Sequence, residues 1–208
     1  MKELYFVRHG QTEWNAIRRM QGQWNSDLNE LGRQQAAVNG QFLKPLDIDY
    51  VIASPLDRTR QTAEIITGHL GMGFDVDERI KEWHCGDWSG EMWDEVHHKW
   101  PEEFAAWRAD QFHYRGPGTE NYPDMIERSK PFLDEMLSSE FSKIAIVSHG
   151  MIGRAMVGTL LSMSPEEMFS FGQTNDTVIH LSGRESGFSV QHYIGGQGPY
   201  VGLPPRNF

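Results

Sequence analysis

Cysteine is almost absent from this sequence, because Cys85 is the only one among 208 residues. A single thiol cannot form an intrachain disulfide, which suits a reducing compartment. No apolar run approaches the roughly 18 residues of a membrane helix, so we expect no membrane span. The first residues also lack the basic segment and the apolar stretch of a signal peptide. These absences predict a cytoplasmic protein.

Positive charge is scarce as well. The chain has 19 Lys and Arg residues against 29 Asp and Glu residues, a formal net charge of −10. This excess of negative charge argues against a general partner among nucleic acids or anionic membranes. Arg18 and Arg19 lie in a polar loop and are expected to be surface charges. In such an acidic chain, a cluster of arginines at one place in the fold would be hard to explain as ordinary surface charge.

Length and composition predict one globular domain with a sizeable core. No internal repeat and no linker marks a second domain, so we expect a single domain over residues 1–208. Residues 83–120 are expected to form an insertion. Residues 177–182 and 188–193 alternate as a β-hairpin does. Residues 195–208 have no periodicity and are expected to be a tail.

Three short apolar runs predict buried β-strands, at residues 4–7, 50–54 and 144–148. Polar residues bound each run at once, as for a strand buried on both faces of a sheet. Stretches of helical periodicity lie between them, among them 30–43 and 121–137. This alternation predicts an α/β fold: a three-layer, doubly wound, mostly parallel sheet with helices on both faces.

Polar side chains with matching chemistry follow these strands. The first strand leads directly into Arg8 and His9, the second is followed by Arg58, and the third by His149. The carboxyl ends of parallel strands meet at one edge of a sheet, where ligands bind in open α/β folds. Two imidazoles and two guanidiniums around one point predict a phosphate site.

The start of the helix that is expected after the second strand supports this interpretation. Ser54 suits an N-cap and Pro55 suits the first helical position, which would place Arg58 in the first turn. A cation there opposes the helix dipole, so a purely structural role would be unusual. An anion held jointly by the helix start and the guanidinium explains the arginine better.

Four blocks of this sequence resemble the histidine phosphatase superfamily, and most of all its phosphoglycerate-mutase-like branch. The blocks are Arg8-His9-Gly10 with Asn15, the run from Ser54 to Ala63, Glu82 before Gly86-Asp87-Trp88-Ser89-Gly90, and Ser148-His149-Gly150. They follow the family's order and cover about residues 1–161. A lone Arg-His-Gly is weak evidence, whereas four ordered blocks are specific.

The resemblance implies a phosphomonoester hydrolase that acts through a phosphohistidine intermediate. By this resemblance His9 attacks phosphorus, and Glu82 protonates the leaving oxygen and later activates water. A neutral imidazole has a free lone pair near pH 7. Its other nitrogen must keep a proton, most simply on a backbone carbonyl near Gly10. The family also implies a small helical insertion over the active site.

The phosphate pocket implied by the resemblance consists of Arg8, Arg58 and His149, with Asn15 on the substrate side. For Gln21, substrate binding and a solvated loop position stay equally open. No metal ion or other cofactor is expected, because the arginines and His149 carry the charge that a magnesium ion would otherwise offset. The expected partner is a small phosphorylated substrate. Whether the chain forms a homodimer stays open.

Two alternatives to a phosphatase remain. A cofactor-dependent mutase would use the same residues but return the phosphoryl group to a bound product. The resemblance implies a longer insertion in such mutases, whereas only the 66 residues 83–148 separate Glu82 from His149 here. A non-catalytic binding module is disfavoured, because such a protein would be expected to lack His9 or Glu82.

Five of the seven tryptophans lie between Trp83 and Trp107. These aromatic residues pack the insertion onto the sheet or, alternatively, line an apolar pocket for the leaving group; packing is the preferred interpretation. The same segment contains histidine and cysteine residues, which can bind metals, but their spacing matches no zinc pattern. We therefore assign them structural or surface positions. They are His84, Cys85, His97 and His98.

Overall fold

The structure of this protein, a computed structural model, describes residues 1–184 and 187–206. A seven-stranded sheet has the order β3-β2-β4-β1-β5-β6-β7. Its strands are β1 (Lys2–Arg8), β2 (Tyr50–Ala53), β3 (Asp75–Val76), β4 (Lys143–Ser148), β5 (Thr177–Arg184), β6 (Gly187–Ile194) and β7 (Gln197–Val201). The helices are α1 (Glu13–Ala16), α2 (Glu30–Leu43), α3 (Asp57–Leu70), α4 (Trp93–Lys99), α5 (Pro101–Ala109), α6 (Tyr122–Ser138), α7 (Gly150–Leu160) and α8 (Pro165–Phe169).

The sheet has a parallel half and an antiparallel half. Strands β3, β2, β4 and β1 pair in parallel, which confirms the three predicted strands and the expected α/β class. Strand β5 pairs antiparallel with β1, and β5 and β6 form the predicted hairpin, whose residues 185–186 lie outside the described residues. Strand β1 therefore lies at the centre of the sheet, and the hairpin extends the sheet on the side of β1 that faces away from β4.

The C-terminal tail is more ordered than its sequence predicted. Strand β7 pairs antiparallel with β6 and forms one edge of the sheet. The expectation of an unstructured tail over 195–208 is therefore wrong for its first half; residues 207–208 lie outside the described residues. Backbone pairing with β6 compensates for the weak side-chain pattern of a strand that is exposed throughout.

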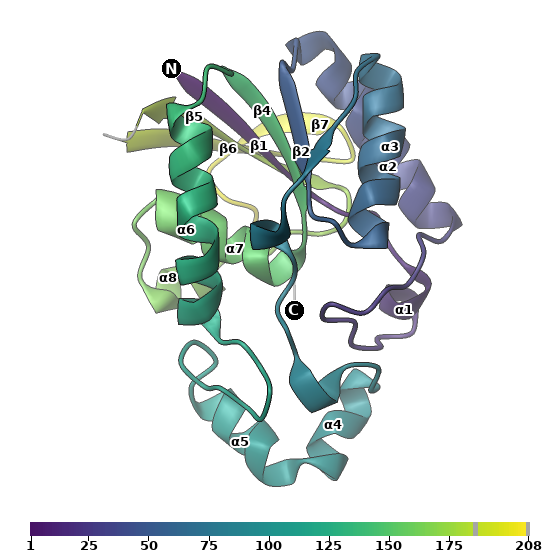
Figure 1. Cartoon of the computed structure of the whole chain (residues 1–208), viewed down its shortest axis with the longest axis vertical. Helices are drawn as coiled ribbons and strands as arrows, with labels where there is room; N and C mark the ends of the chain where they lie inside the picture. Colours follow the sequence, from purple (N-terminus) through teal and green to yellow (C-terminus); the bar gives the residue numbers. More distant parts are fainter. Residues whose placement is uncertain (185–186, 207–208) are drawn as a thin grey trace.

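Helices cover both faces of the sheet, as predicted, and Figure 1 shows them on either side of it. Alternate residues of each strand enter two separate cores. In β1, Leu4 and Phe6 pack with α6 and α7, whereas Tyr5 and Val7 pack with α2 and α3. Burial of each such side chain contributes about 1.5–3 kcal/mol, so both faces hold the central strands in place.

The insertion packs through its aromatic residues. Helices α4 and α5 lie below the sheet in Figure 1. Trp88 is buried, and its ring lies 6.4 Å from Phe104 and 6.3 Å from Trp107. These rings join the same core as α6 and α7. The packing interpretation of the aromatic segment is thus confirmed for its inner members.

The helix that follows the second strand begins later than the sequence predicted. Helix α3 starts at Asp57, and its N-cap is Leu56 rather than Ser54. The prediction of a Ser54 cap is wrong because the Ser54 hydroxyl bonds the ring of His149 instead. Arg58 keeps its place in the first turn. Among the helices of residues 1–184 and 187–206, none is long and apolar enough to cross a membrane.

Two glycines let the loop after β1 lie directly on α2. A Cβ on Gly32 would overlap the carbonyl oxygen of Gln11, and one on Gly10 would overlap the carbonyl oxygen of Gly32. This close approach holds the backbone that follows His9. No larger residue fits there without moving one segment away from the other.

We therefore expect Gly32→Ala to lower the free energy of unfolding by about 1–3 kcal/mol through overpacking. The control is Gly68→Ala on α3, where a Cβ would meet nothing within 4 Å. There alanine should stabilise by about 0.5–1 kcal/mol, because its backbone loses less conformational entropy on folding than that of glycine. Urea unfolding of both variants measures the difference. Equal stabilities would contradict the close approach.

Candidate active site

The three strand ends bring the predicted cations and imidazoles together. Strands β1 and β4 run in register with Arg8 opposite Ser148, so His9 and His149 follow side by side. Their ring centroids lie 5.3 Å apart. Arg58 reaches the same point from the first turn of α3. The sheet thus assembles Arg8, His9, Arg58 and His149 in one place.

His9 is held with one ring nitrogen unprotonated. Its Nδ1 lies 2.8 Å from the carbonyl oxygen of Gly10, so Nδ1 carries the proton and donates it. This is the acceptor that the sequence predicted. Its Nε2 then has the lone pair, and Arg58 Nε donates toward it at 3.3 Å. The imidazole is buried, with 3% of its surface exposed.

Arg58 lies at the centre of the cluster and is 1% exposed. Its Nε also donates to Nδ1 of His149 at 3.2 Å, so both imidazoles share one donor. Its Nη1 and Nη2 donate to the backbone oxygens of Trp24 and Gly22 at 2.8 and 2.7 Å. A guanidinium has five N–H donors, which leaves two of them for an anion.

His149 has the opposite tautomer to His9. Because its Nδ1 accepts from Arg58, its Nε2 carries the proton and donates to the Ser54 hydroxyl at 2.7 Å. The neighbouring Ser148 hydroxyl donates to the Ile80 carbonyl oxygen at 3.0 Å. Ser148, the last residue of β4, and His149, the residue after it, therefore each connect this strand with another segment of the site.

Arg8 is positioned by a loop that the sequence interpretation did not include. Its Nη1 donates to the backbone oxygen of Gln173 at 2.7 Å. The Gln173 side chain donates in turn to the carbonyl oxygens of Phe6 and Thr177 at 2.8 and 3.0 Å. Asn175 donates to the His9 carbonyl oxygen at 2.6 Å.

Gln173 and Asn175 left one signal in the sequence, a polar run directly before the hairpin strand β5. That run approaches His9 only because β5 pairs antiparallel with β1, with Val178 opposite Val7. The register of this pairing is a tertiary property. No local pattern near residue 173 reveals it.

Glu82 lies at the amino end of α7. One carboxylate oxygen accepts from the backbone N–H groups of Trp83 and Ile152 at 2.9 and 3.1 Å. The other accepts from Met151 at 3.2 Å. The first residues of a helix offer free N–H groups and a positive dipole end to an anion. Glu82 is therefore fixed beside His149, the residue before α7.

The surroundings suppress the charged forms of both imidazoles. Burial, and then the charge of Arg58, lower the pKa of His9 and of His149 well below the ordinary 6.5. Burial also lowers the pKa of Arg58, to about 10, so this guanidinium stays charged at neutral pH. At pH 7 the cluster combines charged arginines with neutral imidazoles.

A cavity of about 200 Å³, here called the aromatic cavity, opens over this cluster. His9, Arg58 and Glu82 line it together with Trp93 and Trp107 from the insertion. Some aromatic residues of the insertion thus line a pocket, in addition to the packing preferred from the sequence. Cys85, assigned a structural position, is buried in the wall and makes no group of three metal-ligand residues within the described parts of the chain.

Three loop residues also line the aromatic cavity: Asn15, Arg19 and Gln21. The side-chain oxygen of Asn15 accepts from the Thr12 N–H at 3.2 Å. Gln21 is buried and its Oε1 has no hydrogen-bond partner, so the solvated position left open for it is wrong. Arg19 was expected at the surface, but its Nε is buried without a partner beside Trp14.

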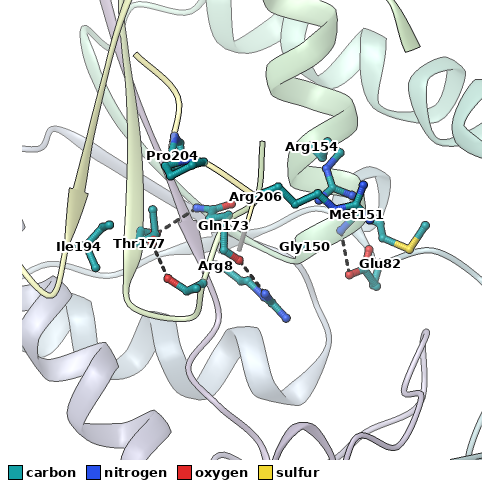
Figure 2. Close-up of a pocket in the computed structure, with 13 residues that line it drawn as sticks. Arg8, Glu82, Gly150, Met151, Arg154, Gln173, Thr177, Ile194, Pro204 and Arg206 are labelled. Carbon is teal, nitrogen blue, oxygen red and sulfur yellow. Dashed lines mark hydrogen bonds between the residues drawn. The ribbon is translucent and has the colours of Figure 1, made fainter. Parts of the chain in front are cut away.

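A second cavity of about 340 Å³, here called the basic cavity, adjoins the first, and Glu82 and Arg8 line both. Figure 2 shows Arg154 and Arg206 extending toward Glu82 from α7 and from the C-terminal segment. The sequence interpretation did not single out either arginine.

The family model of the histidine phosphatase superfamily (branch 1) matches residues 4–194. The chain belongs to the histidine phosphatase superfamily. Among its relatives are phosphoserine phosphatase 1 of Hydrogenobacter thermophilus, 34% identical with 89% of this chain and 90% of the relative covered, and a probable phosphoglycerate mutase of Erwinia tasmaniensis, 40% identical with 78% and 76% covered.

Solved structures of histidine phosphatases agree with this fold. A mycobacterial glucosyl-3-phosphoglycerate phosphatase, solved in complex with VO3, superposes with a TM-score of 0.83 at 30% sequence identity. The alignment covers 93% of this chain and 98% of that one. As a member of the superfamily, the protein is a phosphatase-type enzyme whose family works through a phosphohistidine.

The lowered histidine pKa values predict how stability depends on pH. In the unfolded chain both imidazoles take up protons near pH 6.5, whereas in the folded protein they resist protonation. The unfolded state then binds more protons, so the free energy of unfolding should fall as the pH drops below about 6.5. Each histidine adds a slope of up to about 1.4 kcal/mol per pH unit. Urea unfolding at several pH values should give a flatter profile for His9→Gln, and an unchanged slope would contradict the neutral buried imidazole.

Proposed function

We propose that this protein hydrolyses phosphomonoesters with His9 as the nucleophile. The observation that supports this most is the combination of a proton-bearing Nδ1 on the Gly10 carbonyl with an unprotonated Nε2 beside Arg58. The lone pair of Nε2 faces the place where two arginines can hold a dianionic phosphoryl group. Phosphoryl transfer needs this combination of position and charge more than any other device.

In the first step, His9 Nε2 forms a bond to phosphorus while the bond from phosphorus to the ester oxygen breaks. Glu82 gives its proton to the departing oxygen, so an alcohol leaves and a phosphohistidine remains. Arg8 and Arg58 bind the phosphoryl oxygens. The arriving negative charge favours the protonated form of His149, which then donates to the same group.

In the second step, water attacks the phosphohistidine and Glu82 takes its proton. The bond from Nε2 to phosphorus breaks, inorganic phosphate leaves, and neutral His9 returns. Asn15 and Gln21, which line the aromatic cavity, are proposed to bind the phosphoryl oxygens or the ester oxygen. We propose that no metal ion takes part and that the enzyme works in the cytoplasm, where the lone Cys85 stays reduced.

The second candidate is a phosphoglycerate-type mutase. The name of the Erwinia relative supports it, since that protein is called a probable phosphoglycerate mutase. The short segment 83–148 supports hydrolysis instead, because water has easier access to a phosphohistidine under a smaller insertion. The two candidates share His9 and Glu82, and they differ in what accepts the phosphoryl group.

The nucleophile is tested by trapping the intermediate in the presence of a chelator. Brief incubation with a ³²P-labelled phosphomonoester should leave an acid-labile, base-stable label on the wild-type protein, and His9→Ala should lose both label and turnover. His98→Ala, on the exposed side of α4, is the control and should keep both. Label or turnover in His9→Ala would exclude this nucleophile, and loss of activity that Mg²⁺ restores would exclude a metal-free reaction.

A separate assay distinguishes hydrolysis from mutase activity by its products. With 3-phosphoglycerate and a bisphosphoglycerate primer, we expect phosphate release and little 2-phosphoglycerate. Isomerisation many times faster than release would favour the mutase.

The acid is tested through the leaving group. An alkyl alcohol leaves as a strong base and needs the proton, whereas p-nitrophenolate leaves almost unaided. Glu82→Gln should therefore slow phosphoenzyme formation from an alkyl phosphate about 10²–10⁴-fold, the usual range for a general acid, and from p-nitrophenyl phosphate far less. Rapid-mixing kinetics compare both esters, with Glu102→Gln on the exposed start of α5 as the control. Equal losses for both esters would mean that Glu82 only shapes the site and is not the acid.

A further inference from the structure

The basic cavity has a charge that the hydrolysis of a simple phosphomonoester does not require. Arg154 and Arg206 line it besides Arg8, and Glu82 is the one carboxylate that does so among the described residues. The rest of its lining is neutral, including Gln173 and Thr174. In a chain of net charge −10, this concentration of arginines beside the phosphate site points to a further anion.

Arg154 is the clearest sign of such an anion. Its Nη1 donates to the Tyr122 hydroxyl at 3.0 Å and its Nη2 to the Phe171 carbonyl oxygen at 3.1 Å. Both partners are neutral, and Nε is buried without a partner. Other arginines of this protein pair with carboxylates, for example Arg128 with Glu120 at 2.8 Å. Within the described residues, no carboxylate makes an ion pair with Arg154.

The position of Arg154 connects it with the reaction. It lies about one turn into α7, and the first turn of that helix holds the Glu82 carboxylate. Burial lowers the pKa of Arg8, and the charge of Arg154 adds to this lowering. Glu82 is proposed to protonate the ester oxygen, and it lines the basic cavity together with Arg154 (Figure 2), so the part of the substrate beyond that oxygen can extend into this cavity.

We propose that Arg154 binds a second anionic group carried by the leaving portion of the substrate. This rests on the proposed function and names its substrate class: phosphomonoesters whose alcohol bears a carboxylate or a second phosphate. Two N–H groups fixed by Tyr122 and Phe171 hold the guanidinium plane, and three N–H groups remain for the anion. The aromatic cavity, which His9 and Arg58 line, then holds the reacting phosphoryl group.

The test compares two substrates that differ only in this charge. 3-Phosphoglycerate has a carboxylate where glycerol 3-phosphate has a hydroxymethyl group. Wild-type protein should prefer 3-phosphoglycerate in kcat/KM by at least about tenfold. Arg154→Gln should lower kcat/KM for 3-phosphoglycerate about 10- to 100-fold, as expected for the loss of a hydrogen bond to a charged group. It should change the value for glycerol 3-phosphate less than about threefold.

Two further variants control for charge and folding. Arg60→Gln removes the same charge from the exposed side of α3 and should leave the preference intact. Arg154→Lys keeps the charge but loses the planar fork, so it should restore part of the preference. Unchanged turnover of glycerol 3-phosphate shows that Arg154→Gln is folded. Equal losses on both substrates would overturn the proposal.

A second pair of substrates distinguishes the two anions. Propane-1,3-diol bisphosphate has a second phosphate where the monophosphate has a hydroxyl group, so this pair tests a phosphate as the 3-phosphoglycerate pair tests a carboxylate. A preference confined to one pair identifies that anion as the natural one, and a preference for neither pair overturns the proposal.

Equilibrium binding separates this inference from the proposed function. Calorimetry with His9→Ala and with His9→Ala/Arg154→Gln measures affinity for 3-phosphoglycerate and glycerol 3-phosphate without any turnover. If the wild-type protein hydrolyses none of these esters, nor p-nitrophenyl phosphate, the proposed function fails. An Arg154-dependent preference in binding would still support the second anion site, and its absence would refute it.

Discussion

The structure depends on one buried guanidinium. Arg58 is buried, and a charge in that position costs several kcal/mol unless polar groups replace the lost water. Two carbonyl oxygens of the loop at residues 22–24 and the lone pairs of two imidazoles do so. The same contacts set the tautomers of His9 and His149. An anion completes this arrangement, since it neutralises a charge for which the protein supplies only neutral partners.

The two halves of the sheet contribute differently to this arrangement. The parallel half delivers Arg8, His9 and His149 to one edge, because the strands share direction and register. The antiparallel half brings in the loop that orients them, since β5 begins next to the end of β1. Through that loop Gln173 holds Arg8 and Asn175 holds the His9 carbonyl oxygen. Strands β1 and β5, from the two ends of the chain, thus both position the groups around His9 Nε2.

Two cavities of different character share this centre. The aromatic cavity has tryptophans from the insertion, whereas the basic cavity has arginines from α7 and from the C-terminal segment. Arg8 and Glu82 belong to both, so phosphoryl binding and proton transfer can be common to many substrates. Selectivity would then come from segments outside the sheet, which can change without disturbing it.

The sequence by itself determined the α/β class, the three parallel strands and the four side chains at their ends. Apolar runs bounded by polar residues specify buried strands, and Arg8, His9, Arg58 and His149 have no local structural purpose at those positions. The tertiary structure alone decided the start of α3, strand β7, and the places of Gln173, Asn175 and Arg154. Ser54 illustrates the reason: its hydroxyl suits an N-cap locally, but a ring 95 positions along the chain offers the better partner. Partners of this kind depend on register and packing, which no short window of sequence contains.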